Sequence, residues 1–185
     1  MKKDIILSLT TILAAALVFT ACVRTLPSQP TESGDAKGSS AVLGESITDA
    51  SQGDIEEAYY LLVEQLWQED DGLNEGIEYI SLDLSRAKLE DTAPLLALMQ
   101  DFCDKNGCKL LTLPFEQLEE QGYIEDLYFD KGVLISFEDK ELTETSLKTD
   151  AKKWRSSLGA IGATYTVEKK SKGWEITGVD GSWVS

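Results

Sequence analysis

Residues 77–113 restrict the fold more than any other stretch of the chain. Residues 77–84 alternate apolar side chains with others at a period of two, which is typical of a strand. Residues 91–107 carry apolar side chains at helical spacing between a start that contains proline and a closing glycine. An apolar run at 108–113 follows, so this stretch predicts a right-handed βαβ unit with parallel strands.

The elements on either side of this unit predict an α+β domain. A long helix is expected at 54–68, where apolar residues recur every three or four positions. The elements expected after the unit are a short helix at 114–122, a hairpin of 127–129 with 133–137, and strands at 163–169 and 173–179. The predicted α+β fold has a mixed sheet, with an N-terminal βαβ-like unit, a C-terminal antiparallel meander and the helices packed on one face.

Residues 138–158 fit neither period. Leu142, Leu147, Trp154 and Leu158 are spaced too irregularly for a helix face or for an alternating strand. A strand and an irregular turn are expected in this stretch.

The first 53 residues differ in composition from the rest of the chain. Two lysines precede an apolar run at 5–19 that ends in small residues, which is the layout of a secretory signal peptide and is too short to span a membrane comfortably. Residues 23–53 are rich in Pro, Ser, Thr and Gly without an apolar period, which predicts a disordered tether. The expected division is a signal peptide at 1–21, a lipidated cysteine and tether at 22–53, and one domain at 54–185.

The sequence Phe19-Thr20-Ala21-Cys22 resembles the lipobox of bacterial lipoproteins. The resemblance implies that Cys22 is lipidated and becomes the new N-terminus. The domain would then be anchored outside the cytoplasm, on the cell membrane or on an outer membrane where the organism has one. An uncleaved anchor that ends in a chance cysteine is the alternative. Segments 132–137, 154–162 and 183–185 are similar to small lipoproteins of unassigned function, which implies no activity.

The chain is strongly acidic and carries a formal net charge of −16 at pH 7. Removal of residues 1–21 takes away two lysines and one aspartate and changes this charge to −17. Phosphates of nucleic acids repel such a chain, so nucleic acid is not expected as a partner. The charge is uneven, because residues 148–185 have seven basic and four acidic side chains, whereas residues 22–147 have a net charge of −20.

Histidine is absent from the sequence. Its absence excludes Ser-His-Asp and Cys-His nucleophiles and the zinc sites that need histidine. The sequence also lacks a G-x-S-x-G nucleophile elbow and a phosphate-binding P-loop motif. Residues 69–75 are acidic but lack the alternating ligand spacing of a calcium loop, so they predict a solvated turn. No cofactor and no metal site are predicted.

Cys103 and Cys108 flank the turn that is expected to close the helix of the βαβ unit. A reversal at Gly107 can bring the two side chains together, and a disulfide could form outside the cytoplasm. Two buried free thiols are the alternative.

The stretch around Trp154 combines cations, hydroxyl groups and an indole. Its members are Lys152, Lys153, Trp154, Arg155, Ser156 and Ser157. Side chains of these types can hold a carboxylate, a phosphate or a sugar, so they form a candidate binding face. In the alternative reading, Trp154, Trp174 and Trp183 belong to the core and the lysines are solvated.

Two functional hypotheses follow. The first is a lipid-anchored binding module outside the cytoplasm, with a cell-envelope protein or an anionic or sugar ligand as its partner. The second is a hydrolase of cell-wall or carbohydrate material that uses two carboxylates, of which Asp83 has the most favourable position at a strand end. The first is preferred, because no pair of nucleophile and base can be drawn from a chain without histidine.

Overall fold

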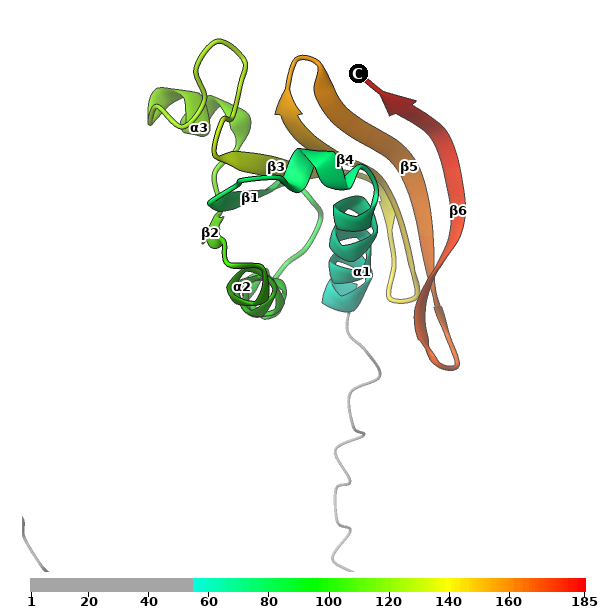
Figure 1. Ribbon diagram of the computed structural model, residues 1–185. Helices are drawn as coiled ribbons and strands as arrows, with labels where there is room; N and C mark the ends of the chain where they lie inside the picture. Colours follow the sequence, from blue (N-terminus) through cyan, green and yellow to red (C-terminus); the bar gives the residue numbers. More distant parts are fainter. Residues whose placement is uncertain (1–54) are drawn as a thin grey trace, which may run out of the picture. The chain divides into compact units, whose positions relative to one another are not determined.

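The computed structural model describes residues 55–185, which form a curved sheet with helices packed against it (Figure 1). The predicted signal peptide, Cys22 and the tether lie outside the described residues. None of the helices within residues 55–185 is long and apolar enough to cross a membrane.

Six strands build one mixed sheet in the order β2-β1-β3-β4-β5-β6. Strand β1 pairs in parallel with β2 and β3, and the remaining neighbours are antiparallel. The α+β prediction, with a βαβ unit followed by an antiparallel meander, is therefore confirmed. The elements are α1 (Ile55–Gln68), the 3-10 helix η1 (Asp71–Asn74), β1 (Tyr79–Arg86), α2 (Ala93–Asn106), β2 (Lys109–Leu111), α3 (Phe115–Glu120), β3 (Gly132–Leu142), β4 (Ser146–Ser156), β5 (Gly159–Lys170) and β6 (Gly173–Val184).

The ends of α2 carry the proline and the glycine that the sequence predicts. Asp91 Oδ1 accepts a hydrogen bond of 2.9 Å from the backbone N–H of Ala93, in the first turn of α2. Gly107 closes the helix in the left-handed conformation with φ 70°, and the N–H of Cys108 donates to the carbonyl of Cys103 at 2.9 Å. The chain therefore reverses within a few residues and enters β2 parallel to β1.

Helices α1 and α2 cover one face of the sheet, as Figure 1 shows. The buried face of α1 includes Tyr59, Leu62 and Leu66, which pack into the same core as apolar side chains of β1, β3, β4 and β5. Burial of a single large apolar side chain contributes roughly 1.5–3 kcal/mol, so this layer holds the domain together.

Helix α3 packs on the opposite face, which we call the outer face. Its Leu118 is buried with Ile124, Phe129 and Leu134 in a second, smaller core. Leu134 can reach this core because it alternates along β3 with the side chains that face α1. The expectation that helices pack on one face thus describes α1 and α2, and α3 is the exception.

The hairpin expected from residues 127–137 is wrong. Asp126 and Leu127 have φ values of 50° and 59°, and such left-handed residues end an extended segment. Glu125 and Tyr128 exchange two backbone hydrogen bonds of 2.9 and 3.1 Å around them and close a tight turn. Strand β3 starts only at Gly132, and it pairs with β1 and β4 instead.

Residues 138–158 form the end of β3, a turn at 143–145 and all of β4, so the expected strand and turn are both present. Their apolar spacing is irregular for two physical reasons. A bulge between Asp139 and Glu141 shifts the alternation of β3. In addition, three of the positions that face the helices are polar, namely Asp139, Thr149 and Lys153, which are buried.

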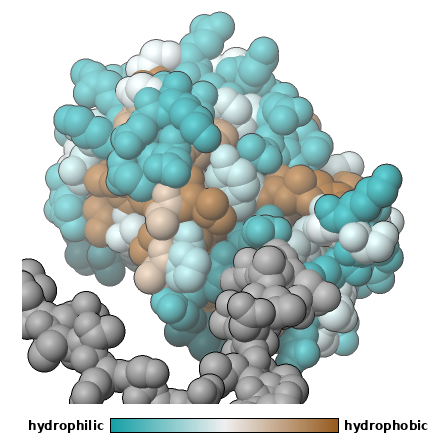
Figure 2. Space-filling model, turned by 90° about the horizontal axis from the view of Figure 1, so that it is seen from below, coloured by the Kyte–Doolittle hydropathy of each residue, from teal (hydrophilic) through white to brown (hydrophobic). Residues whose placement is uncertain are grey.

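On the side seen in Figure 2, hydrophilic residues form most of the surface and hydrophobic residues gather in two areas. A cavity of about 600 Å³ lies at the start of α1, where Ile55, Leu89 and Leu142 line it together with charged side chains.

Candidate functional site

Strand β4 divides the predicted binding face between the two sides of the sheet. Successive side chains of a strand point to opposite faces. Lys152 and Trp154 therefore lie on the outer face, whereas Lys153 and Arg155 point toward α1 and the turn that follows it. Ser156 and Ser157 lie at the end of β4, next to the turn at Leu127. The structure thus does not gather the six predicted residues on one surface.

Lys153 is fully buried and holds the C-terminal end of α1. Its ammonium donates to the carbonyl oxygens of Glu69 and Asp70 at 2.6 and 2.9 Å, and to Asn74 Oδ1 at 3.2 Å. These acceptors lie where the helix dipole is negative, which favours a cation. Burial lowers the pKa of Lys153 to about 8, although the nearby carboxylates of Asp70 and Glu69 act in the opposite direction.

Arg155 fixes the same turn from its other end. Its guanidinium donates to the carbonyls of Leu73 at 3.0 Å, Glu75 at 2.8 Å and Asp130 at 2.7 Å. The predicted acidic turn at 69–75 is therefore held by two cations through its backbone rather than through its carboxylates. We conclude that Lys153 and Arg155 serve the fold.

The outer face carries a groove that contains the other half of the predicted face. We call it the outer groove; it has a volume of about 460 Å³ and lies between α3 and the end of β6. Its rings come from Phe115, Trp154 and Trp183, and its charged groups from Asp83, Arg86, Glu116, Glu138 and Lys152. A second cavity of about 310 Å³ adjoins it and shares Lys152 and Trp183. Together they form an elongated depression across the sheet.

One row of register partners forms the floor of the outer groove. It runs from β1 to β6 through Asp83, Ser136, Lys152, Gly162 and Trp183. Neighbouring strands lie about 4.8 Å apart, so this row spans five strands and places an acid, a hydroxyl group, a cation and an indole in a line.

Gly162 makes room for the indole of Trp183. A Cβ atom at position 162 would lie 2.8 Å from Cζ2 and 2.9 Å from Cε2 of Trp183, which is closer than atoms can approach. The indole therefore rests directly on the backbone of β5 while 43% of the residue stays exposed. Trp154 is held from the side by Phe115, with ring centroids 5.0 Å apart at an angle of 74°. The two indoles are fixed by the sheet before any ligand arrives.

Lys152 brings an unpaired cation to the middle of this floor. The neighbouring carboxylate of Glu138 binds Arg86 and Lys140, at 2.8 and 3.1 Å. Asp150 accepts a hydrogen bond of 2.6 Å from Thr164 Oγ1 and one of 2.9 Å from Lys140, and these bonds, together with the nearby charges of Lys140 and Lys152, lower its pKa. Among residues 55–185, no carboxylate forms an ion pair with Lys152.

Two carboxylates of the outer groove, Glu138 and Asp83, are engaged by other groups of the protein. A hydrolase that uses two carboxylates keeps one carboxylic acid protonated as an acid while the other is ionised. Lys140 and Arg86 lower the pKa of Glu138, which favours its ionised form. Asp83 Oδ1 accepts a hydrogen bond of 2.9 Å from the backbone of Ser85.

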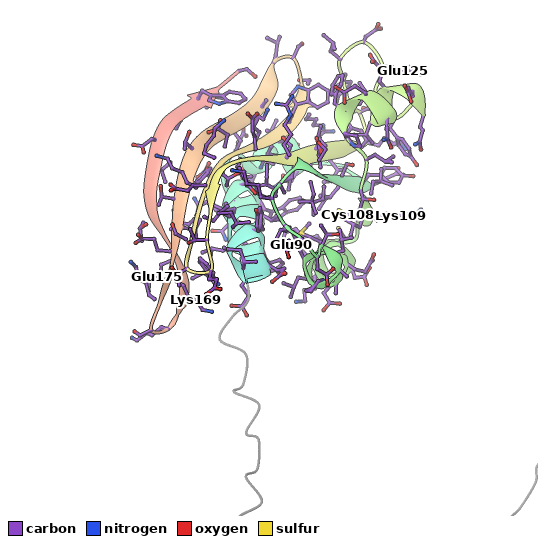
Figure 3. The ribbon with its side chains drawn as sticks, turned by 180° about the vertical axis from the view of Figure 1, so that it is seen from behind. Glu90, Cys108, Lys109, Glu125, Lys169 and Glu175 are labelled. Carbon is purple, nitrogen blue, oxygen red and sulfur yellow. The ribbon has the colours of Figure 1, made fainter. Side chains whose placement is uncertain are left out.

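Cys103 and Cys108 meet at the turn between α2 and β2, where Figure 3 labels Cys108. Both are buried free thiols in the structure. The pKa of Cys103 is raised to about 12, mainly by burial, and burial also raises the pKa of Cys108. Neither is therefore a reactive thiolate at neutral pH, and their oxidation outside the cytoplasm stays a prediction.

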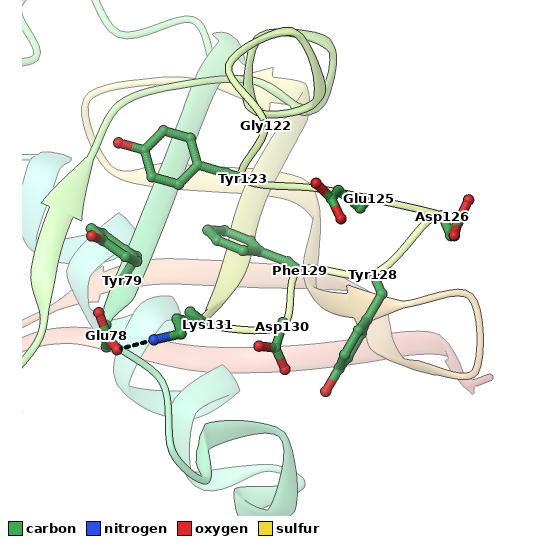
Figure 4. Close-up of a pocket in the computed structure, with 10 residues that line it drawn as sticks. All are labelled: Glu78, Tyr79, Gly122, Tyr123, Glu125, Asp126, Tyr128, Phe129, Asp130 and Lys131. Atoms are coloured by element: carbon green, nitrogen blue, oxygen red, sulfur yellow. Dashed lines mark hydrogen bonds and ion pairs between the residues drawn. The ribbon is translucent and has the colours of Figure 1, made fainter. Parts of the chain in front are cut away.

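A larger cavity of about 710 Å³ lies beside the turn at 125–128 (Figure 4). Its groups are engaged with the protein itself: Lys131 binds Glu78 at 2.6 Å, and Tyr79 packs edge-on against Tyr123 with centroids 5.3 Å apart. Cations of the chain already lie over two of its rings, Lys109 over Tyr79 and Arg155 over Tyr128. The outer groove, where Lys152 has no ion pair, is therefore the better candidate site.

Within residues 55–185, no group of three or more acidic or cysteine side chains is arranged to hold a metal ion. Comparisons with protein-family models, with curated proteins and with solved structures each give no match.

Part of the outer groove was missing from the sequence interpretation. The predicted binding face does not include Trp183, and the alternative reading places all three tryptophans in the core; Trp174 lies in the main core, Trp154 packs against the smaller one, and Trp183 is 43% exposed. Phe115 was read as part of a helix face and not as a groove residue. The exposure of Trp183 could have been predicted from its place in the polar, glycine-containing C-terminal segment, where few apolar neighbours could bury it.

Proposed function

We propose that this protein is a lipid-anchored binding module outside the cytoplasm, and that its outer groove holds an extended polymer of the cell envelope. The observation that carries the proposal is the depression in which the indoles of Trp154 and Trp183 lie near Lys152, which has no ion pair within residues 55–185. Rigid aromatic rings provide a large contact area at a low cost in conformational entropy, and a few polar groups then set orientation.

The shape of the depression favours a polymer over a compact small molecule. The two cavities adjoin at Lys152 and Trp183, so the depression continues over β3, β4, β5 and β6. A small ligand is usually surrounded on most sides by its pocket, whereas a linear chain can lie along an open channel. The lipid on Cys22 and the tether at 23–53 would place this surface near envelope material.

The proposal is tested by co-sedimentation of the purified full-length chain, in detergent, with a cell-wall preparation stripped of protein. The wild-type chain should sediment with the wall material. The Trp183→Ala variant should bind about tenfold more weakly, since loss of one stacking ring costs on the order of 1–3 kcal/mol.

Tyr128→Ala is the matched control, because Tyr128 is exposed to the same extent as Trp183, 43%, but lies away from the outer groove. It should bind like the wild type. Equal binding of all three chains, or equal loss in both variants, would exclude the outer groove as the binding site.

A further inference from the structure

We infer that the ligand of the outer groove is a glycan that carries carboxylate groups, and that Lys152 recognises these groups. This inference rests on the proposed function and names its ligand class. It is based on the chemistry of the groove floor, where a hydroxyl group, a cation and an indole are register partners.

The rings of the outer groove favour a sugar over an apolar peptide. Trp183 rests on Gly162 and presents its remaining surface to solvent, and Trp154 is braced by Phe115. The apolar C–H face of a sugar ring can stack on such a ring, while its hydroxyl groups reach the polar rim. That rim includes Ser85 and Glu116. An amphipathic helix would need a continuous apolar groove, which the charged side chains interrupt.

The charges of the outer groove favour a sparsely acidic glycan. Arg86 and Glu138 neutralise each other at 2.8 Å, so Lys152 is the one cation of the groove that is left without an ion pair among the described residues. Asp83 and Glu116 also line the groove, and together with the acidic chain they repel a polymer that is anionic at every unit. Asp150 lines the adjoining cavity beside Lys152 and adds to this repulsion, so a polymer with carboxylates on only some of its sugars is favoured.

The probe is an octasaccharide of hyaluronan, in which every second sugar carries a carboxylate. Its counterpart is the same octasaccharide after reduction of the carboxylates to primary alcohols, which keeps the stacking surface and removes the charge. Affinities of both are measured by titration calorimetry with the purified full-length chain.

The expected result has two parts. Carboxylate reduction should weaken binding to the wild type about tenfold, since a hydrogen bond between charged groups contributes roughly 1.5–3 kcal/mol. Lys152→Gln should show the same loss with the acidic octasaccharide and no further loss with the reduced one. Lys152→Arg should retain most of the binding, which shows that position 152 can be changed without loss of the fold.

Lys172→Gln is the matched control, because Lys172 is exposed at the turn between β5 and β6 and the substitution removes the same charge. It should bind like the wild type. Equal losses in Lys152→Gln and Lys172→Gln would overturn the inference in favour of general charge attraction. Equal affinity of the wild type for the two octasaccharides would overturn it in favour of a neutral ligand.

Failure of the inference differs from failure of the proposed function. If Trp183→Ala abolishes binding to wall material while Lys152→Gln and carboxylate reduction change nothing, the groove binds a polymer but not through carboxylates. If Trp183→Ala also binds wall material like the wild type, both proposals are wrong.

Discussion

At the residue scale, the adjacent lysines Lys152 and Lys153 lie on opposite faces of the sheet and have different surroundings. Lys153 points to the helix side, where three oxygen acceptors surround its ammonium, whereas Lys152 faces the outer groove. The sequence located this basic stretch but treated it as one surface. The division follows from strand geometry, and it was missed because residues 138–158 were not assigned to strands throughout.

The burial of Lys153 predicts a specific pH dependence of stability. The pKa of Lys153 is about 8 in the folded chain, below the 10.5 of an ordinary lysine. Between these pH values the unfolded chain binds more protons, so the free energy of unfolding should rise with pH, by about 3 kcal/mol over the whole window. Below about pH 8 this contribution should be constant.

The measurement is urea unfolding of the wild type and of Lys153→Met at several pH values from 7 to 10. Other titrating groups affect both chains, so the difference between their unfolding free energies isolates Lys153. This difference should shift in favour of the wild type above pH 8. A difference that stays constant, or that shifts in favour of Lys153→Met, would contradict the assigned role of burial.

At the element scale, the sequence predicted the elements whose local signals agree with their tertiary surroundings. The βαβ unit was predicted because its caps, its Gly107 and its apolar spacing all point to one structure. The false hairpin at 127–137 arose because a turn with two left-handed residues has no glycine or asparagine to mark it. Strands β3 and β4 were obscured by a bulge and by the buried polar residues Asp139, Thr149 and Lys153.

The turn at 125–128 carries a measurable strain. Leu127 has φ 59°, a conformation that costs a residue with a Cβ atom roughly 1–2 kcal/mol. Its side chain is 51% exposed and therefore contributes little packing. Leu127→Gly should raise the free energy of unfolding by about 1 kcal/mol, measured by urea denaturation. Leu127→Ala keeps the Cβ atom and serves as the control; if it stabilises the chain as much as glycine does, the strain is not the cause.

At the scale of the whole molecule, the sheet separates the main core from the proposed binding site. The face that α1 and α2 cover contains the main core, and the outer face carries the groove. The sequence predicted Lys152 and Trp154 as binding residues, but it could not show that Asp83 of β1 and Trp183 of β6 share one row. Four successive strand pairings bring these two residues, which are 100 positions apart in the chain, into that row.

The proposed location predicts the chemistry of the N-terminus. The native protein, extracted from membranes, should have a mass that corresponds to a chain that starts at Cys22 and carries acyl groups. Cys22→Ala should accumulate as the unprocessed precursor in the membrane fraction, because the modified residue is lost. An unacylated mature mass for the native protein, or an unchanged mass for Cys22→Ala, would contradict lipid anchoring.

The central claim is that the outer groove is occupied when the protein is in its envelope, and hydroxyl-radical footprinting of the tryptophans tests it most directly. Oxidation of each residue is compared between intact cells and the protein purified in detergent. Trp183 should be protected on cells, whereas Tyr128, which is equally exposed at 43%, should be oxidised to the same extent in both samples. Equal oxidation of Trp183 in the two samples would contradict the claim.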